Sequence, residues 1–124
     1  MRETVWFKAK VIQGKRIAHT LGFPTINLDN PTVLHGQKEG VYACLVKLDT
    51  KIYKGVLYYG PRLILGEIEK ILEIFVFDFE KEIYGETVSF QTLDFIRGVQ
   101  NFPNFNAFKK QLVLDCQKAK EILK

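Results

Sequence analysis

Short segments in which apolar and polar residues alternate, separated by turn signals, occupy most of the chain before residue 100. A period of two is typical of a strand with one buried face. The segments are TVWFKAKVI (4–12), YACLVKL (42–48), KIYKGVLYYG (51–60), KILEIFVFDF (70–79) and ETVSFQTLDFI (86–96). The short DTK turn predicts that 41–48 and 52–59 form a hairpin. Five or six short strands at this density predict an antiparallel barrel or sandwich.

The C-terminal segment, NFNAFKKQLVLDCQKAKEILK, follows a helical period instead. An apolar stripe with spacings of three and four predicts an amphipathic helix, for which Asn104 or Asn106 is the expected N-cap. Because the stripe must be buried, we expect this helix to pack over the barrel. The stripe contains Phe105, Phe108, Leu112, Cys116, Ala119 and Leu123.

Composition fits one globular domain over residues 1–124, with 47% hydrophobic and 26% charged residues. No apolar run approaches the roughly 20 residues that span a bilayer, and the N-terminus MRETVWFKAK lacks the apolar region of a signal peptide. Cys44 and Cys116 are far apart, so neither a zinc site nor a disulfide framework is indicated, and a cytoplasmic location is expected. The net charge of +4 comes from scattered lysines, which favours a solvated surface over an RNA- or anion-binding patch.

Residues 20–28, TLGFPTINL, combine apolar residues typical of a strand with Gly22 and Pro24, which both weaken a sheet ladder. Thr25 and Asn27 stand two residues apart, so an extended chain places both on one face. Their neutral oxygens suit magnesium, whereas the alternative is that a Thr-x-Asn pair belongs to a turn.

The preceding loop, GKRIAHTLG (14–22), is bounded by glycines and carries Lys15, Arg16 and His19. Backbone N–H groups and cations together can hold phosphate. The spacing fits neither a Walker A loop nor a dinucleotide-binding fingerprint, and an ordinary basic hairpin loop is the alternative.

Glu73 lies within the long segment 70–79, on the same face as Ile71, Phe75 and Phe77. A carboxylate on an apolar face is costly unless it is paired or functional, and such a group can act as general base toward an alcohol. The alternative is that the opposite face forms the core and Glu73 lies near solvent. The pattern leaves both interpretations open because both faces are apolar.

Aromatic residues stand out at two further places. Tyr84 closes the turn after the long strand, where it can stack on a base or cap the core. The segment FIRGVQNFPNF (95–105) combines Arg97 with Phe95, Phe102 and Phe105 in an expected loop before the helix. Rings and a guanidinium suit a planar aromatic ligand, and they also suit plain docking of the helix.

Taken in this order, these segments resemble the riboflavin kinase family over about Val5 to Lys120. The most specific match is GFPTIN, which is similar to the family's Pro-Thr-Ala-Asn signature with Ile26 in place of Ala. The other matching segments are GVYA (40–43), Glu73 followed by DFEKEIYGE, FIR…NF, and a helix that carries Asp115.

The resemblance implies a mainly β fold, a six-stranded antiparallel Greek-key barrel with a C-terminal α-helix. It also implies an ATP-dependent kinase that transfers the γ-phosphoryl to the ribityl 5′-hydroxyl of riboflavin, giving FMN and ADP. Glu73 is the implied catalytic base, and Thr25 and Asn27 are the implied ligands of Mg²⁺ or another divalent cation. The residues implied in ATP binding are Gly14, His19, Gly22, Thr25, Val76, Asp78 and Tyr84. Those implied in flavin binding are Arg97, Phe102 and Asp115.

The chain departs from the family at Ala18 and His19, where the phosphate loop usually has Gly and then Arg or Lys, and at Tyr59 and Leu63. The loop departure favours the alternative of a non-catalytic flavin- or nucleotide-binding barrel. A small basic RNA-binding barrel, supported by net charge and aromatic residues, is a third interpretation. We expect a cytoplasmic monomer that acts on riboflavin and ATP, without nucleic-acid or membrane partners. FMN is its expected final product, because the adenylyltransferase domain of bacterial relatives is absent.

Overall fold

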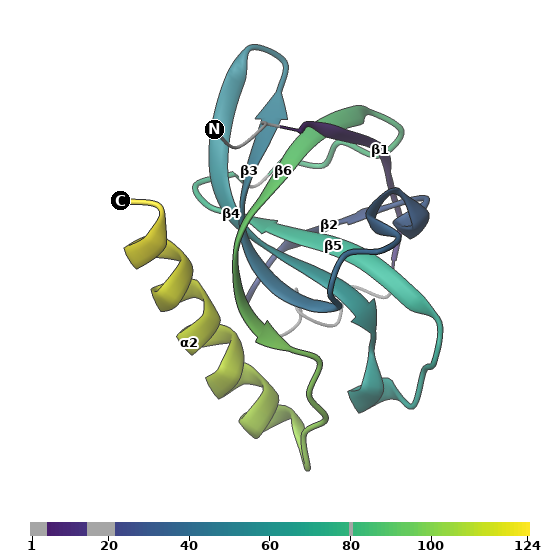
Figure 1. Ribbon diagram of the computed structural model, residues 1–124, viewed down its shortest axis with the longest axis vertical. Helices are drawn as coiled ribbons and strands as arrows, with labels where there is room; N and C mark the ends of the chain where they lie inside the picture. The colour runs from purple at the N-terminus through teal and green to yellow at the C-terminus, as the bar shows by residue number, and fades with distance from the viewer. Residues whose placement is uncertain (1–4, 15–21, 80) are drawn as a thin grey trace.

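Six antiparallel strands close into a barrel in a computed structural model that describes residues 5–14, 22–79 and 81–124. A C-terminal helix, α2 (Phe105–Ile122), lies along one side of this barrel (Figure 1). Two short 3-10 turns, η1 (Pro31–Leu34) and η2 (Leu63–Leu65), lie in the connections. The strands are β1 (Phe7–Ile12), β2 (Thr25–Leu28), β3 (Gly40–Leu48), β4 (Lys51–Pro61), β5 (Lys70–Val76) and β6 (Thr87–Gly98). The fold expected from the sequence is confirmed.

The strand order around the barrel is β1-β2-β5-β4-β3-β6. β3 and β4 form the expected hairpin, with Gly40 opposite Tyr59 at one end and Leu48 opposite Lys51 at the other. β5 pairs with β4 on one side and with β2 on the other, so the connection from β2 to β3 is a Greek-key crossover. This crossover brings residues 25–28 beside residues 72–75, which are far away in the sequence.

The interior of the barrel is filled by one face of each strand. On β5 the core residues are Leu72, Ile74 and Val76, each at most 2% exposed. Glu73 therefore points to the outside of the barrel, yet it is 7% exposed because other groups cover it. The opposite face is thus the core, as one interpretation held, but Glu73 does not lie near solvent.

α2 packs on the outer face of the barrel through the C-terminal half of its apolar stripe, as expected. This half joins a second buried cluster, which contains Val41, Ala43, Val56, Phe77, Ala119 and Leu123. The N-terminal half of the stripe is less covered, and Phe105 is 43% exposed. Within the described part of the chain, no helix combines the length and apolar character needed to cross a membrane.

β6 extends further than the sequence pattern predicts. Arg97 and Gly98 pair with Val41 and Gly40 of β3, so Arg97 lies on a strand and the expected loop at this position is wrong. Register shifts in the β3–β6 pairing interrupt the alternation here, which hides the strand from a period-two pattern. A Cβ at Gly40 would lie 2.1 Å from the carbonyl oxygen of Arg97, so this close approach requires glycine.

Asn104, one of the two expected caps, is the N-cap of α2, because its Oδ1 accepts a 2.8 Å hydrogen bond from the N–H of Ala107. We expect Asn104→Ala to lower the free energy of unfolding by about 1 kcal/mol, measured by urea denaturation. Asn106→Ala is the matched control, since Asn106 is exposed within the helix, and it should change stability by less than about 0.5 kcal/mol. Equal losses in the two variants would contradict the cap assignment.

Candidate functional site

Thr25 and Asn27 lie on β2, next to β5. The two strands pair so that Asn27 lies directly opposite Glu73. Since alternate residues share a face, the three side chains project from the same side of the sheet. Gly22, with a φ of +92°, and Pro24 stand just before the strand, so the residues that weaken a sheet ladder lie outside it.

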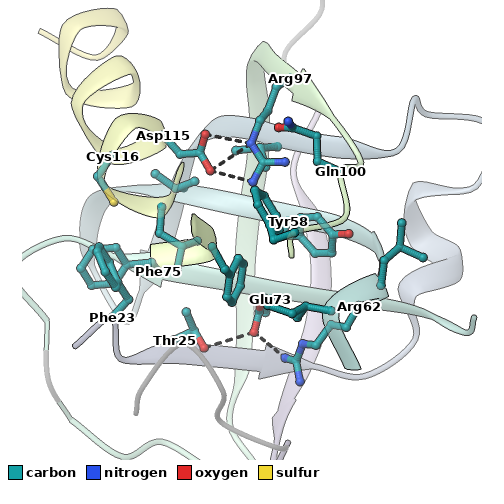
Figure 2. Close-up of a pocket in the computed structure, with 17 residues that line it drawn as sticks. Phe23, Thr25, Tyr58, Arg62, Glu73, Phe75, Arg97, Gln100, Asp115 and Cys116 are labelled. Atoms are coloured by element: carbon teal, nitrogen blue, oxygen red, sulfur yellow. Dashed lines mark hydrogen bonds and ion pairs between the residues drawn. The ribbon is translucent and has the colours of Figure 1, made fainter. Parts of the chain in front are cut away.

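Arg62 joins these three side chains into one hydrogen-bonded group, here called the Glu73 cluster. Figure 2 shows its bonds among Thr25, Glu73 and Arg62. Its Nη2 donates to Glu73 Oε2 at 2.6 Å and to Asn27 Oδ1 at 3.0 Å. The Thr25 hydroxyl donates to the same Glu73 oxygen at 3.2 Å. Arg62 thus balances the charge of a buried carboxylate, which would be costly to bury without a partner.

Arg62 is a site residue that the sequence analysis missed. It follows β4 at the start of η2, and its carbonyl oxygen accepts hydrogen bonds from the N–H groups of Leu65 and Glu67, which fix the backbone. The side chain then reaches the residues of two other strands. The available signal was a lone arginine between Pro61 and the apolar run Leu63–Leu65.

Gly14 lies against the Asn27 side chain. A Cβ at residue 14 would lie 2.4–2.6 Å from the amide atoms of Asn27, so the backbone can approach only because residue 14 is glycine. The structure therefore brings predicted Gly14 to the Glu73 cluster. Gly22 is exposed in a left-handed turn, and His19, with Ala18, lies outside the described residues.

A cavity of about 680 Å³, open to solvent at its mouth, lies between the outer face of the barrel and the N-terminal half of α2. Figure 2 shows its two polar ends, Glu73 with Arg62 at one and Arg97 with Asp115 at the other, with aromatic rings between them. Apolar side chains form most of the wall, among them Phe23, Val56, Phe75, Phe102, Phe108 and Leu112.

The Arg97–Asp115 end is a tight ion pair. Arg97 Nε donates to Asp115 Oδ1 and Nη2 to Oδ2, each at 2.9 Å, and Gln111 donates to the same carboxylate. Asp115 is 1% exposed, and the Arg97 guanidinium lies 5.7 Å from the centre of the Phe102 ring. The three residues predicted for flavin binding are therefore brought together in one cavity wall.

Two other titratable groups of this cavity are poor proton acceptors at neutral pH. Burial raises the pKa of the Tyr58 phenol to about 12, against a smaller opposing effect of Arg97, and its O–H donates to the Pro61 carbonyl. Burial, with the charge of Asp115, raises the pKa of the Cys116 thiol to about 11. The two carboxylates of this cavity each have an arginine partner, Asp115 with Arg97 and Glu73 with Arg62.

A second cavity, of about 510 Å³, shares the lining residue Thr25 with the first. Besides Thr25, two more of the residues predicted for ATP binding belong to its wall: Val76, which is also part of the barrel core, and Tyr84, which is 41% exposed. Asp78 lies exposed in a left-handed turn after β5 and lines neither cavity.

The oxygens of the Glu73 cluster suit a hard cation. Thr25 Oγ1, Asn27 Oδ1 and Glu73 Oε2 converge on a place where Arg62 now supplies the positive charge. Mg²⁺ prefers such oxygen ligands and usually takes one or two from the protein. Among the described residues, no group of three His, Cys, Asp or Glu side chains forms an all-protein metal site.

Fold and site together define a β-barrel protein with two cavities that share Thr25. A family model described as Flavokinase, riboflavin kinase, matches residues 1–123, so the chain belongs to the riboflavin kinase family.

Two curated relatives agree with this family. The chain is 38% identical over 106 residues to the RNA-binding riboflavin kinase RibR of Bacillus subtilis, covering 85% of this chain and 45% of that protein. It is 36% identical over 115 residues to a bifunctional riboflavin kinase/FMN adenylyltransferase of Haemophilus influenzae, covering 90% of this chain and 36% of that protein. The chain thus spans less than half the length of these two relatives.

Two solved structures share the fold. Riboflavin kinase from Trypanosoma brucei superposes with a TM-score of 0.67 at 20% identity, over 95% of this chain and 78% of that one. A Streptococcus pneumoniae protein described as a macrolide-efflux protein superposes with a TM-score of 0.78 at 27% identity, over 94% of this chain and 38% of that one.

The Arg97–Asp115 pair gives a stability prediction. Asp115→Ala leaves the Arg97 side chain, which is 14% exposed, without its carboxylate partner, and we expect it to lower the free energy of unfolding by about 3 kcal/mol. Adding Arg97→Ala should restore part of the loss, and urea denaturation of all three variants measures the coupling. Glu39→Ala, which breaks an exposed pair with Lys70, is the control and should cost less than about 1 kcal/mol. Strictly additive losses for Arg97 and Asp115 would contradict the prediction.

Proposed function

We propose that this chain is an ATP- and divalent-cation-dependent riboflavin kinase that forms FMN and ADP. The observation that carries the proposal is the position of Thr25, which lines both cavities and donates a hydrogen bond to Glu73. A kinase needs one site for the nucleotide, one for the acceptor, and a junction at which the γ-phosphoryl meets the acceptor hydroxyl. The riboflavin kinase family supplies the identity of the two molecules.

We assign the first cavity to riboflavin. Its apolar and aromatic walls suit a flat ring system, and its polar groups are few and lie at the two ends. Arg97, Phe102 and Asp115 at one end would contact the ring system. The ribityl tail would then extend along the cavity toward Glu73 at the other end.

We assign the second cavity to ATP, with Tyr84 at its rim and Val76 in its wall. The triphosphate would end at Thr25, near Gly14, with Gly22 in the turn just before β2. Roles for His19 and Asp78 in ATP binding stay predictions.

Glu73 is the proposed general base. Its Oε2 accepts the proton of the ribityl 5′-hydroxyl while the hydroxyl oxygen forms a bond to the γ-phosphorus. The bond from that phosphorus to the bridging oxygen breaks, and ADP leaves with the electron pair. Thr25 Oγ1 and Asn27 Oδ1 are the neutral oxygens that would hold Mg²⁺, which when bound neutralises charge on the phosphates.

The proposal is tested by incubating the pure protein with riboflavin, MgCl₂ and ATP and separating the flavins by chromatography. Formation of FMN that requires all three additions is expected. Quenching of flavin fluorescence without FMN would overturn the proposal in favour of a non-catalytic binding barrel. One relative is named as RNA-binding, so RNA retention at physiological salt is measured in parallel, and we expect none.

We expect Glu73→Gln to bind riboflavin normally and to lose about 10²- to 10⁴-fold in kcat, because the amide keeps the shape but cannot accept the proton. Binding is measured by flavin fluorescence and kcat by FMN formation. Glu121→Gln, an exposed position on α2, is the control for loss of one carboxylate. Near-normal kcat in Glu73→Gln would remove the base from the mechanism.

We expect Thr25→Ala to raise the MgCl₂ concentration needed for half-maximal FMN formation by about tenfold, because one neutral oxygen ligand is lost. Thr25→Ser keeps the hydroxyl and serves as the matched control, with a titration close to that of the wild type. Identical MgCl₂ titrations for the Ala and Ser variants would show that the hydroxyl is no ligand.

A further inference from the structure

Arg62 has a buried donor without a partner. Its Nε–H makes no hydrogen bond within the part of the chain that the structure describes, although the side chain is only 6% exposed. Buried polar groups are nearly always hydrogen-bonded, so this atom requires an explanation. Arg62 lines the first cavity beside Thr25 and Glu73, so a turn of its side chain would bring this buried N–H to an acceptor in the cavity.

Arg97, at the other end of the cavity, provides a comparison. Its Nε and Nη2 both donate to Asp115, and its Nη1 donates to the Gly98 carbonyl. On Arg62 the corresponding Nε/Nη2 edge uses only Nη2, which is shared between Glu73 and Asn27. A guanidinium edge with a spare N–H is suited to a phosphate, which it binds through two parallel hydrogen bonds.

The position of the base places the reacting phosphoryl group near this edge. A hydroxyl that donates to Glu73 Oε2 lies about 3 Å from it, and the attacked phosphorus lies about 3 Å further on. Arg62 Nη2 is 2.6 Å from the same Oε2. The oxygens of the transferring group therefore come within reach of the guanidinium.

We propose that Arg62 is a catalytic residue that contacts the γ-phosphoryl group and stabilises the charge on its oxygens during transfer. This inference rests on the proposed function. Its role matches that of an arginine supplied in cis to other phosphoryl-transfer sites. The cationic side chains among the described residues that line the two cavities are Arg62, Arg97 and Lys81. Arg97 is held by Asp115, and Lys81 lines the second cavity but not the first.

The contacts of Arg62 without ligand agree with this role. Its Nη2 bonds the two oxygens, Asn27 Oδ1 and Glu73 Oε2, that the proposed function assigns to the cation and to the acceptor hydroxyl. When Arg62 turns toward the phosphoryl oxygens, it releases both of them. Asn27 Oδ1 then contacts the cation, and Glu73 Oε2, which keeps its hydrogen bond from Thr25, accepts one from the acceptor hydroxyl in place of its ion pair.

The test compares wild type, Arg62→Gln, Arg62→Lys and Lys70→Gln as full chains, each checked by thermal denaturation. Lys70→Gln is the matched control, because it also removes one positive charge near the end of β4, from an exposed pair with Glu39. We expect Arg62→Gln to lower kcat for FMN formation by at least about 10³-fold, with KM for riboflavin within about threefold of wild type. Arg62→Lys should recover part of kcat, since it restores the charge without the planar edge.

A second measurement separates contact with the phosphoryl group from an effect through Glu73. Binding of MgADP with and without aluminium fluoride, a mimic of the transferring group, is measured by calorimetry in the presence of riboflavin. We expect Arg62→Gln to keep the MgADP affinity measured without fluoride but to lose the increase in affinity that aluminium fluoride causes. Glu73→Gln should keep most of that increase.

Two results would overturn the role of Arg62 and leave the proposed function intact. The first is that the wild type forms FMN and kcat of Arg62→Gln lies within about threefold of the wild-type kcat. The second is that aluminium fluoride increases MgADP affinity equally in Arg62→Gln and Glu73→Gln. If Arg62→Gln does not fold, the same comparison is made with Arg62→Lys. A wild-type kcat and a wild-type increase in MgADP affinity with fluoride in that variant would overturn the contact between the planar guanidinium and the phosphoryl group. Absence of FMN with the wild type would overturn the proposed function and this inference together.

Discussion

The pairing of β2 with β5 is the constraint on which the candidate site depends. Because Asn27 lies opposite Glu73, an amide, a hydroxyl and a carboxylate project from one outer face of the barrel. A register shift of one residue would turn the polar β2 side chains into the core and Leu28 out of it. Leu28 is 3% exposed in that core, so packing inside the barrel holds the chemical groups outside it in place.

The two ion pairs of the first cavity differ in what they leave unsatisfied. Arg97 and Asp115 meet through two parallel hydrogen bonds, whereas the Arg62–Glu73 pair shares one nitrogen with Asn27 and leaves an N–H without a partner among the described residues. Buried ion pairs stabilise folds poorly compared with apolar packing, so stability alone does not account for either. Under the proposed function, both pairs would contact the ligands that bind between them.

Short-range periodicity predicted an antiparallel barrel or sandwich, the helix and one shared face for Thr25 and Asn27, and the family resemblance implied the six-stranded barrel. The periodicity could not choose the face of Glu73, since both faces of β5 are apolar and only the closure of the barrel separates core from exterior. The sequence could not predict the role of Arg62, because its contacts join the end of β4 to β5 and β2. Arg62 and Asn27 are 35 residues apart in the sequence. Arg97 was placed in a loop because irregular pairing with β3 hides the strand period.

α2 packs on the barrel through its C-terminal turns and borders the first cavity through earlier turns. Ala119 is completely buried in the second cluster, whereas Phe108 and Leu112, two to three turns earlier, face the cavity. Phe108 and Leu112, which shape the cavity, and Ala119, which packs on the barrel, therefore lie on different turns of one helix. Under the proposed function, a change at residue 108 or 112 would alter which ring substituents fit the cavity while residue 119 keeps the helix packed on the barrel.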